Sequence, residues 1–399
     1  MSEKEIGFLR MGKTAEASKP VKEIGIGILG YAFMGKARSN AYMRVPIFFY
    51  PPPAKPRLVA IFGRTTEAVA EASKRYGYET YYTDWRKLIK DDRVQLVSNG
   101  LPNNMHAVPC IETAEAGKDI FCEKPLAMNV DEAKEMHKAV EKAGVINMVG
   151  FNYRFLPAIL LAKKMIDEGF IGKILQYRAC YLQEWIIDPN FPLVWRLNKE
   201  ICGSGALGDL AAHTIDLARV LIGEVESVNA MTETFYKERP LPEKPSVKAN
   251  QEVDDVSISL VRFKNGSVGS IEGSRFCAGR KNFMRIEVHG TEGSILFNLE
   301  RLNELDVYSR RDPDDRMGFR NILVTESNHP FIKYWWPHGH ILGWEHTQIH
   351  EVYHLLDCIA NEKPIAPMGA TFYDGLKCQE VMSAILESAE KGRWVNVSD

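Results

Sequence analysis

The stretch IGIGILGYAFMG, Ile24 to Gly35, decides the fold that this sequence predicts. The apolar residues 24–29 predict a short buried strand, the glycines predict a tight turn, and residues 34–43 can continue as a helix. In dinucleotide-binding folds a Gly-x-Gly-x-x-Gly turn at this place lets the backbone approach a pyrophosphate at the positive end of the helix. Alanine replaces the middle glycine here, and a turn that serves helix packing alone is the alternative. The candidate cofactor-binding residues of the turn are Gly30, Ala32, Phe33, Met34 and Gly35.

Strand and helix patterns alternate along the residues that follow the turn. Strands are expected at residues 58–62, 94–97, 119–122 and 146–149, and helices at residues 66–76, 85–90, 107–116 and 130–143. Such alternation predicts βαβ units and a parallel sheet that is covered by helices on both faces. We therefore predict a dinucleotide-binding α/β domain over residues 23–150.

The periodicity changes after residue 150. One amphipathic helix is expected at residues 157–168, and then short strands follow one another between turn signals such as Lys264-Asn265-Gly266. These strands are expected at residues 173–181, 226–235, 255–263, 266–274, 282–290 and 293–298. A length of 399 residues also favours two domains, because a single core stops growing near ~250–300 residues. We predict an α+β domain with a large, mainly antiparallel sheet over residues 151–399, and an N-terminal extension over residues 1–22.

The composition excludes several classes of protein. Charged residues make up 26% of the chain and the net charge is -2, so nothing favours nucleic acid or an anionic membrane as a partner. The first twenty residues contain no apolar segment of the kind that secretion signals carry. The seven cysteines are scattered and include no Cys-x-x-Cys pair, which suits reduced thiols. We expect a cytoplasmic protein.

The end of the second predicted strand lacks the acidic residue that usually binds the adenosine ribose. Gly63, Arg64 and Thr65 stand there instead and are the next candidate cofactor-binding residues. An arginine and a hydroxyl can accommodate the 2′-phosphate of NADP. Arg64 can equally lie over the adenine face or point into solvent, so the choice between NAD and NADP stays open here.

Two further motifs carry groups suited to moving a proton. Lys124 follows Glu123 at the carboxyl end of the fourth predicted strand, the edge at which open parallel sheets bind ligands, although a surface lysine is the alternative. Asp209 and His213 are four residues apart in a predicted helix and therefore share one face. Histidine can take the hydroxyl proton of an alcohol near neutral pH. An ordinary helical pair remains the other interpretation, but the small residues that precede it favour close approach to a ligand.

Taken together, the motifs resemble the Gfo/Idh/MocA oxidoreductases, the family of glucose–fructose oxidoreductase and inositol dehydrogenase. The resemblance rests on Gly30-x-Ala32-x-x-Gly35, Pro102-Asn103-x-x-His106, Glu123-Lys124-Pro125 and Asp209-x-x-x-His213, and covers about residues 23–395. It implies a Rossmann domain, an open-faced sheet domain that also mediates self-association into a homodimer or homotetramer, and an active site between them.

The resemblance also implies roles for these residues. Lys124 would bond the reacting substrate oxygen, His213 would act as general acid and base, and Asp209 would bind a neighbouring hydroxyl and orient the histidine. A cis peptide would precede Pro125. The residues that would line the nicotinamide side are Pro102, Asn103, His106, Glu123 and Lys124.

Aromatic residues in the second domain resemble those of family members that act on sugars. Trp185 could stack on the C–H face of a ring, while Tyr153 and Gln183 could read its hydroxyls. The aromatic stretch 334–340 has the same resemblance. Packing in the core or at a subunit contact is the alternative for these aromatic side chains.

Three histidines lie at helical spacing, His346, His350 and His354, and two histidines four residues apart on a helix can bind zinc. Because no cysteine or second set of ligands accompanies them, we predict no metal site and interpret the segment as a helix that lines the cleft or an interface.

The sequence therefore predicts an NAD(P)-dependent oxidoreductase, with NAD slightly preferred. It would oxidise a secondary hydroxyl of a sugar, anhydrosugar or cyclitol to a ketone, or catalyse the reverse reaction. One alternative is an enzyme that keeps and recycles its nicotinamide, including glycoside-cleaving enzymes that begin with oxidation at C3. Another is a non-catalytic sensor of sugars or dinucleotides, which the intact lysine, aspartate and histidine argue against.

Overall fold

The computed structural model describes residues 21–397, so the extension predicted over residues 1–22 lies almost wholly outside the described residues. The first domain contains a six-stranded sheet in which all neighbouring strands are parallel. The parallel arrangement was predicted, but the strand at Thr80–Tyr82 was not. The strand order is β3-β2-β1-β4-β5-β6. The strands are β1 (Glu23–Leu29), β2 (Lys55–Phe62), β3 (Thr80–Tyr82), β4 (Leu96–Asn99), β5 (Asp119–Cys122) and β6 (Asn147–Val149). The order reverses between β1 and β4, and such a reversal creates a ligand crevice at the carboxyl ends of the strands.

Helices connect these strands and have recognisable starts and stops. The helix α2 (Thr66–Tyr76) ends where Gly77 adopts a φ of 79°, and α5 (Val130–Ala143) begins where the Asn129 side chain accepts a hydrogen bond from the amide of Glu132. The other connecting helices are α1 (Phe33–Phe48), α3 (Trp85–Ile89) and α4 (Ala107–Glu115). The strand β4 lies two residues later than expected, because the turn that ends α3 extends through the bond from the amide of Val94 to the carbonyl of Asp91.

The second domain contains a nine-stranded sheet that is antiparallel except where β12 pairs with β7. Its order is β16-β15-β14-β13-β7-β12-β11-β8-β17. The expected strands are β7 (Ile174–Leu182), β8 (Val225–Glu233), β11 (Val256–Phe263), β12 (Val268–Ser274), β13 (Phe283–Gly290) and β14 (Gly293–Asn298). The sequence did not predict β15 (Glu304–Ser309), β16 (Arg320–Leu323), β17 (Val395–Asn396) or the separate hairpin of β9 (Glu238–Leu241) and β10 (Lys244–Asn250).

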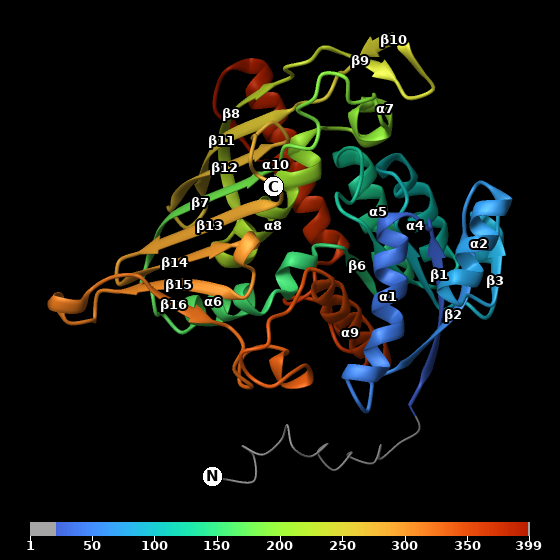
Figure 1. Cartoon of the computed structure of the whole chain (residues 1–399), viewed down its shortest axis with the longest axis horizontal. Coiled ribbons are helices and arrows are strands. Elements are labelled where there is room, and N and C mark those ends of the chain that lie inside the picture. Colours follow the sequence, from blue (N-terminus) through green and yellow to red (C-terminus); the bar gives the residue numbers. More distant parts are fainter. Residues whose placement is uncertain (1–20, 398–399) are drawn as a thin grey trace.

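Helices cover one face of the large sheet and connect it to the first domain. Figure 1 shows α8 (Ala212–Leu221) and α10 (Phe372–Lys391) beside the sheet, and α9 (Glu345–Asn361) below them next to α1. Apolar side chains of α9 share a core with β1 and α1, while α10 packs against both α5 and β8. The helix expected at residues 157–168 is α6 (Pro157–Asp167). The C-terminal part of the chain therefore returns to the first domain and helps to frame the crevice.

No helix in the described part of the chain is long and apolar enough to cross a membrane.

Candidate active site

The glycine turn between β1 and α1 is shaped for the close approach of a ligand. Gly30 has a φ of 96°, which favours glycine, and a Cβ on Gly35 would lie 2.2 Å from the carbonyl oxygen of Gly30. The helix begins at Phe33, and the methyl group of Ala32 at its N-cap cannot cap the first amides. Uncapped amides and the positive end of the helix dipole suit a pyrophosphate, so the turn fits a bound dinucleotide.

The residues after β2 lie beside this turn. A Cβ on Gly63 would clash with the ring of Tyr31 at 2.2 Å, so glycine at this position makes room for the turn. Arg64 and Thr65 are exposed, and Thr65 is the N-cap of α2. None of these three residues lines the central cavity, and their place at the carboxyl end of β2 is where an adenosine ribose lies in this type of fold.

A cavity of about 420 Å³ lies in the crevice, and both domains contribute to its walls. Most of the candidate residues from the sequence line this cavity: Ala32, Phe33, Met34, Pro102, Asn103, Glu123, Lys124, Tyr153, Gln183, Asp209 and His213. Tertiary structure therefore brings together candidate residues that are up to 181 positions apart in the sequence (from Ala32 to His213), and Gln348 from near the C-terminus lines the same cavity.

Lys124 projects from the end of β5 toward the second domain. The peptide bond before Pro125 is cis, as the family resemblance implied. The ammonium group of Lys124 donates to the backbone carbonyl of Asp209 at 2.6 Å and lies 3.4 Å from its Oδ1. This contact spans the cavity floor and joins the two domains at the site.

A buried ion pair below the cavity fixes the residue before the lysine. Nη2 of Arg38, a fully buried residue of α1, donates to Oε1 of Glu123 at 2.6 Å, and Nη1 donates to the carbonyls of Asn99 and Phe121 at the ends of β4 and β5. A Cβ on Gly150 would lie 2.8 Å from Nη2 of Arg38, so glycine there leaves room for the pair. Sequence reasoning missed Arg38, because no motif marks a charged residue on the buried face of a helix.

Asp209 is a carboxylate surrounded by cations. Burial opposes its ionisation, but the charges of Lys124, Arg196 and Arg275 outweigh burial and lower the pKa of Asp209 from 3.8 to about 2. Nη1 of Arg275 lies 3.8 Å from Oδ2 of Asp209. Asp209 is therefore ionised at neutral pH and can accept hydrogen bonds from a ligand.

His213 lies at the cavity wall in an aromatic cage. The rings of Phe151, Tyr153 and Tyr181 surround its imidazole at centroid distances of 5.9, 4.6 and 6.0 Å. Its Nδ1 is buried and has no hydrogen-bond partner among the residues that the structure describes. Burial lowers the pKa of His213 well below 6.5, the charge of Lys124 acts in the same direction, and Asp209 opposes them. The imidazole is therefore neutral near pH 7 and able to accept a proton.

The segment that carries these two residues is not one regular helix. Asp209 lies in a π-helical turn (Leu207–Ala211), and His213 lies in the first turn of α8. Single π-helical turns are common at functional sites, because the wider turn re-aims the side chains that it carries. Both side chains line the cavity. The sequence predicted a regular α-helix here and did not predict the π-helical turn.

A chain of hydroxyl and amide groups also lines the cavity, beginning at the two tyrosines beside His213. The hydroxyl groups of Tyr153 and Tyr181 are 2.8 Å apart, and Tyr181 donates to Oδ1 of Asn282 at 2.6 Å. The side-chain amide of Gln183 donates to the same oxygen at 2.7 Å. These groups present donors and acceptors of the kind that read hydroxyls.

Like Gly30, Gly35, Gly63, Arg64 and Thr65, the candidates His106 and Trp185 do not line the cavity. His106 is fully buried, and its ring nitrogens lie 3.0 Å from the carbonyl oxygen of Pro125 and 2.9 Å from that of Leu101, so it links the two loops that border the site. Trp185 packs edge-on against Phe191 and does not reach the cavity. The aromatic stretch 334–340 lies elsewhere too, since Tyr334 and Trp335 pack against the end of α1.

Several cavity residues were not found by sequence reasoning: Trp195, Arg196, Arg275, Asn282, Trp344 and Gln348. Arg275 directly follows β12, and its place at a strand end is the one signal that could have indicated it. Trp344, at the N-cap of α9, stacks on Phe33 of the glycine turn with ring centroids 5.3 Å apart. This stack brings the second domain into contact with the cofactor turn.

The three histidines of α9 have structural partners. His350 accepts a hydrogen bond from the indole of Trp335 at 2.7 Å, and its Nδ1 lies 2.9 Å from the carbonyl oxygen of Phe155. Nε2 of His354 lies 2.8 Å from the carbonyl oxygen of Ile365. Within residues 21–397 there is no cluster of three or more ligating side chains that could hold a metal ion. The helix lines the cleft through Gln348 instead.

The fold and the cavity define a class of protein, the nicotinamide-dependent oxidoreductases with a Rossmann domain and a separate sheet domain. Residues 24–151 match a family model described as an oxidoreductase family with an NAD-binding Rossmann fold. Residues 159–296 match the model of the GFO/IDH/MocA C-terminal domain. The chain belongs to the Gfo/Idh/MocA oxidoreductase family, as its motifs predicted, and its first domain is an NAD-binding Rossmann domain.

Similar proteins place the chain within that family. Levoglucosan dehydrogenase of Pseudarthrobacter phenanthrenivorans is 44% identical over 391 residues, which cover 94% of this chain and 99% of the relative. A solved structure of levoglucosan dehydrogenase in complex with NADH and levoglucosan has a TM-score of 0.91 at 45% identity and covers 94% of this chain and 100% of that chain. The scyllo-inositol 2-dehydrogenase (NAD(+)) of Bacillus subtilis is 29% identical and covers 75% of this chain and 84% of the relative.

Proposed function

We propose that this protein oxidises a secondary hydroxyl of a sugar, anhydrosugar or cyclitol to a ketone, with NAD as the oxidant. The observation that carries the proposal is a neutral, buried His213 on one side of a cavity whose floor holds the Lys124–Asp209 pair. The glycine turn reaches the same cavity through Ala32, Phe33 and Met34. A dinucleotide held by this turn would therefore present its hydride acceptor to the cavity that His213 lines.

The chain's own residues would manage the proton and the orientation of the alcohol. The ammonium group of Lys124 would donate a hydrogen bond to the reacting oxygen, and Asp209 would accept one from a neighbouring hydroxyl. The imidazole of His213 would take the hydroxyl proton, and positioned groups of this kind contribute about 10²–10⁴-fold to a rate. When bound, NAD would supply the acceptor for the hydride that leaves the same carbon.

The remaining walls support a ring-shaped polyol as substrate. Tyr153, Gln183 and Asn282 offer donors and acceptors to hydroxyls, while Trp195 and Trp344 offer aromatic faces to C–H groups. Relatives named levoglucosan dehydrogenase and inositol dehydrogenase support anhydrosugars and cyclitols as the first compounds to test. The name of the B. subtilis relative and the description of the family model support NAD over NADP.

We also propose that the protein is cytoplasmic and forms a homodimer or homotetramer. The seven cysteines, all within the described residues, are free thiols, which supports a reducing compartment. Self-association is supported by apolar side chains on the outer face of the large sheet, which α8 and α10 do not cover.

The first experiment mixes the purified protein with NAD or NADP and with levoglucosan, inositols, glucose or xylose, and follows the absorbance of NADH or NADPH. We expect turnover with NAD and at least one of these compounds. Lys124→Met and His213→Asn should each lower kcat by about 10²–10⁴-fold. Because neither residue forms the glycine turn, the dissociation constant of NAD should stay close to that of the unchanged protein.

Trp394→Phe serves as the control, since that ring is 42% exposed, lies over Arg262 of the large sheet and does not line the cavity. Full turnover in both the Lys124 and the His213 variants would contradict the assignment. Product formed without net NADH release would contradict the dehydrogenase reaction and favour a recycled cofactor.

A further inference from the structure

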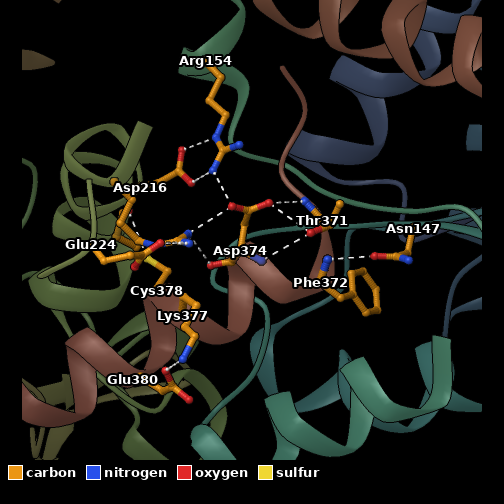
Figure 2. A network of polar contacts seen from close by, with 12 residues as sticks. Asn147, Arg154, Asp216, Glu224, Thr371, Phe372, Asp374, Lys377, Cys378 and Glu380 are labelled. Atoms are coloured by element: carbon orange, nitrogen blue, oxygen red, sulfur yellow. Dashed lines mark hydrogen bonds and ion pairs between the residues drawn. The ribbon is translucent and has the colours of Figure 1, made fainter. Parts of the chain in front are cut away.

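A buried network of ion pairs lies behind the catalytic helix. Arg154, in the turn Asn152–Phe155, donates two hydrogen bonds to the carboxylate of Asp216 on α8 (Figure 2). The donor–acceptor distances are 2.8 and 2.5 Å. The same guanidinium lies 3.3 Å from Oδ1 of Asp374 in the first turn of α10. Arg219 of α8 lies 3.1 Å from that carboxylate and also bonds Glu224. None of these residues lines the cavity.

The two residues of the central pair are neighbours of cavity residues. Arg154 directly follows Tyr153, whose ring lies 4.6 Å from the ring of His213. Asp216 lies three residues after His213 on α8, so both project from adjacent turns of one side of the helix. One short segment therefore contacts α8 twice, at the imidazole through Tyr153 and one turn later through Arg154.

The network continues to the first domain. Oδ2 of Asp374 accepts a hydrogen bond from the amide of Thr371, and the two residues form a capping box at the start of α10. The next amide, of Phe372, donates to Oδ1 of Asn147 at 2.8 Å, as Figure 2 shows. Asn147 begins β6, which pairs with β5, the strand that leads to Lys124. Hydrogen bonds and strand pairing thus connect the helix of His213 with the strand of Lys124.

We propose that Arg154 and Asp216 are positioning residues that hold His213 at its working distance from Lys124 and the substrate. This inference rests on the proposed function. A carboxylate that accepts two parallel bonds from a guanidinium is fixed in both distance and angle, which a single contact does not achieve. Both side chains are buried, with exposed fractions of 3% and 1%. Apolar residues can often replace a buried ion pair without loss of stability. We therefore infer that this pair serves to fix the position of α8 rather than to stabilise the fold.

The test replaces the pair by apolar side chains of similar size, Arg154→Met together with Asp216→Leu. This leaves no uncompensated charge in the core, so we expect a folded protein that binds NAD with an unchanged dissociation constant. A displacement of His213 by about 1 Å should lower kcat on the order of 10²-fold, while the KM of the substrate changes much less. The matched control is Lys377→Met with Glu380→Leu, an ion pair on α10 in which Glu380 is buried and Lys377 is partly exposed. This double variant should keep kcat unchanged.

A second readout does not depend on turnover. In NMR titrations of the histidine ring, the pKa of His213 should rise toward 6.5 in the double variant, because a displaced ring gains solvent. If the double variant does not fold, Arg154→Lys provides a second test. Lysine keeps the positive charge but cannot form the two parallel hydrogen bonds to Asp216, so kcat must still fall. Unchanged kcat in the folded double variant, or in Arg154→Lys, would overturn the inference. Failure of the proposed function looks different, since the unchanged protein would then oxidise no polyol.

Discussion

Single residues at the cavity act through the charges around them. His213 stays neutral because burial and the nearby ammonium of Lys124 both disfavour its charged form, while Asp209 favours it. The proposed oxidation needs the neutral imidazole as its proton acceptor, so we expect activity to be lost only when the pH falls through this lowered pKa. In a plot of kcat against pH, the fall of kcat on the acidic side should therefore lie below pH 6.5, the ordinary pKa of histidine. We call this part of the profile the acid limb.

Two substitutions should move this limb in opposite directions. Asp209→Asn removes a charge that raises the pKa of His213, so the limb should shift to lower pH. Lys124→Met removes a charge that lowers the pKa, so the limb should shift to higher pH. Residual turnover measured across the acidic range checks both signs. Shifts of the same sign in both variants would show that His213 is not the group that titrates.

The motifs predicted part of this cavity at the level of residues. Lys124, Asp209 and His213 line it because each belongs to a short pattern with a recognisable place at a strand end or on a helix. Arg196 and Trp344 line it as well, but they lie in segments that resemble no motif. Their roles depend on contacts across the cavity, which local sequence does not encode.

Among the elements, α9 shows how one helix combines core packing with the site. Gln348 faces the cavity, whereas His350 is fully buried between Trp335 and the carbonyl oxygen of Phe155. Because Nε2 of His350 accepts a bond, its proton resides on Nδ1 and the ring is neutral. Burial lowers the pKa of His350 to about 3.

This lowered pKa makes α9 sensitive to acid. In the unfolded chain His350 binds a proton below about pH 6.5, whereas in the folded chain it does so only near pH 3. Its contribution to stability is therefore complete above pH 6.5 and falls by up to about 1.4 kcal/mol per pH unit as the pH drops toward 3. His350→Gln should unfold more easily at neutral pH but lose part of this slope.

Urea unfolding at several pH values measures the slope separately from the absolute stability. An equal slope in the unchanged protein and in His350→Gln would contradict the prediction.

At the scale of the whole molecule, the two domains share their helices. The α9 helix packs on α1 of the first domain, and α10 lies between α5 of the first domain and β8 of the large sheet (Figure 1). This leaves the other face of the sheet open. An apolar strip formed by Met231, Ile258, Leu260 and Val268 lies on that face, and each of its side chains is at least 40% exposed. Cross-strand neighbours place Met231 directly opposite Ile258.

We expect copies of the chain to associate through this apolar strip. Met231→Glu together with Leu260→Glu would put charges into the contact, and the mass measured by light scattering should fall to that of a smaller species. Ile47→Glu, on α1 of the other domain and 65% exposed, is the control and should keep the mass of the unchanged protein. An unaltered mass in the double variant would place the contact elsewhere.

The sequence by itself determined the parallel sheet and the glycine turn, and it singled out Lys124, Asp209 and His213, which line the cavity. Strands, helices and glycine turns follow from periodicity and backbone freedom over a few residues. Only the tertiary structure decided how these parts meet. It placed His106 and Trp185 outside the cavity, brought Arg196, Arg275 and Trp344 into it, and folded α9 and α10 back onto the first domain. Such contacts join residues far apart in the chain and depend on the packing of the whole core, which no local pattern records.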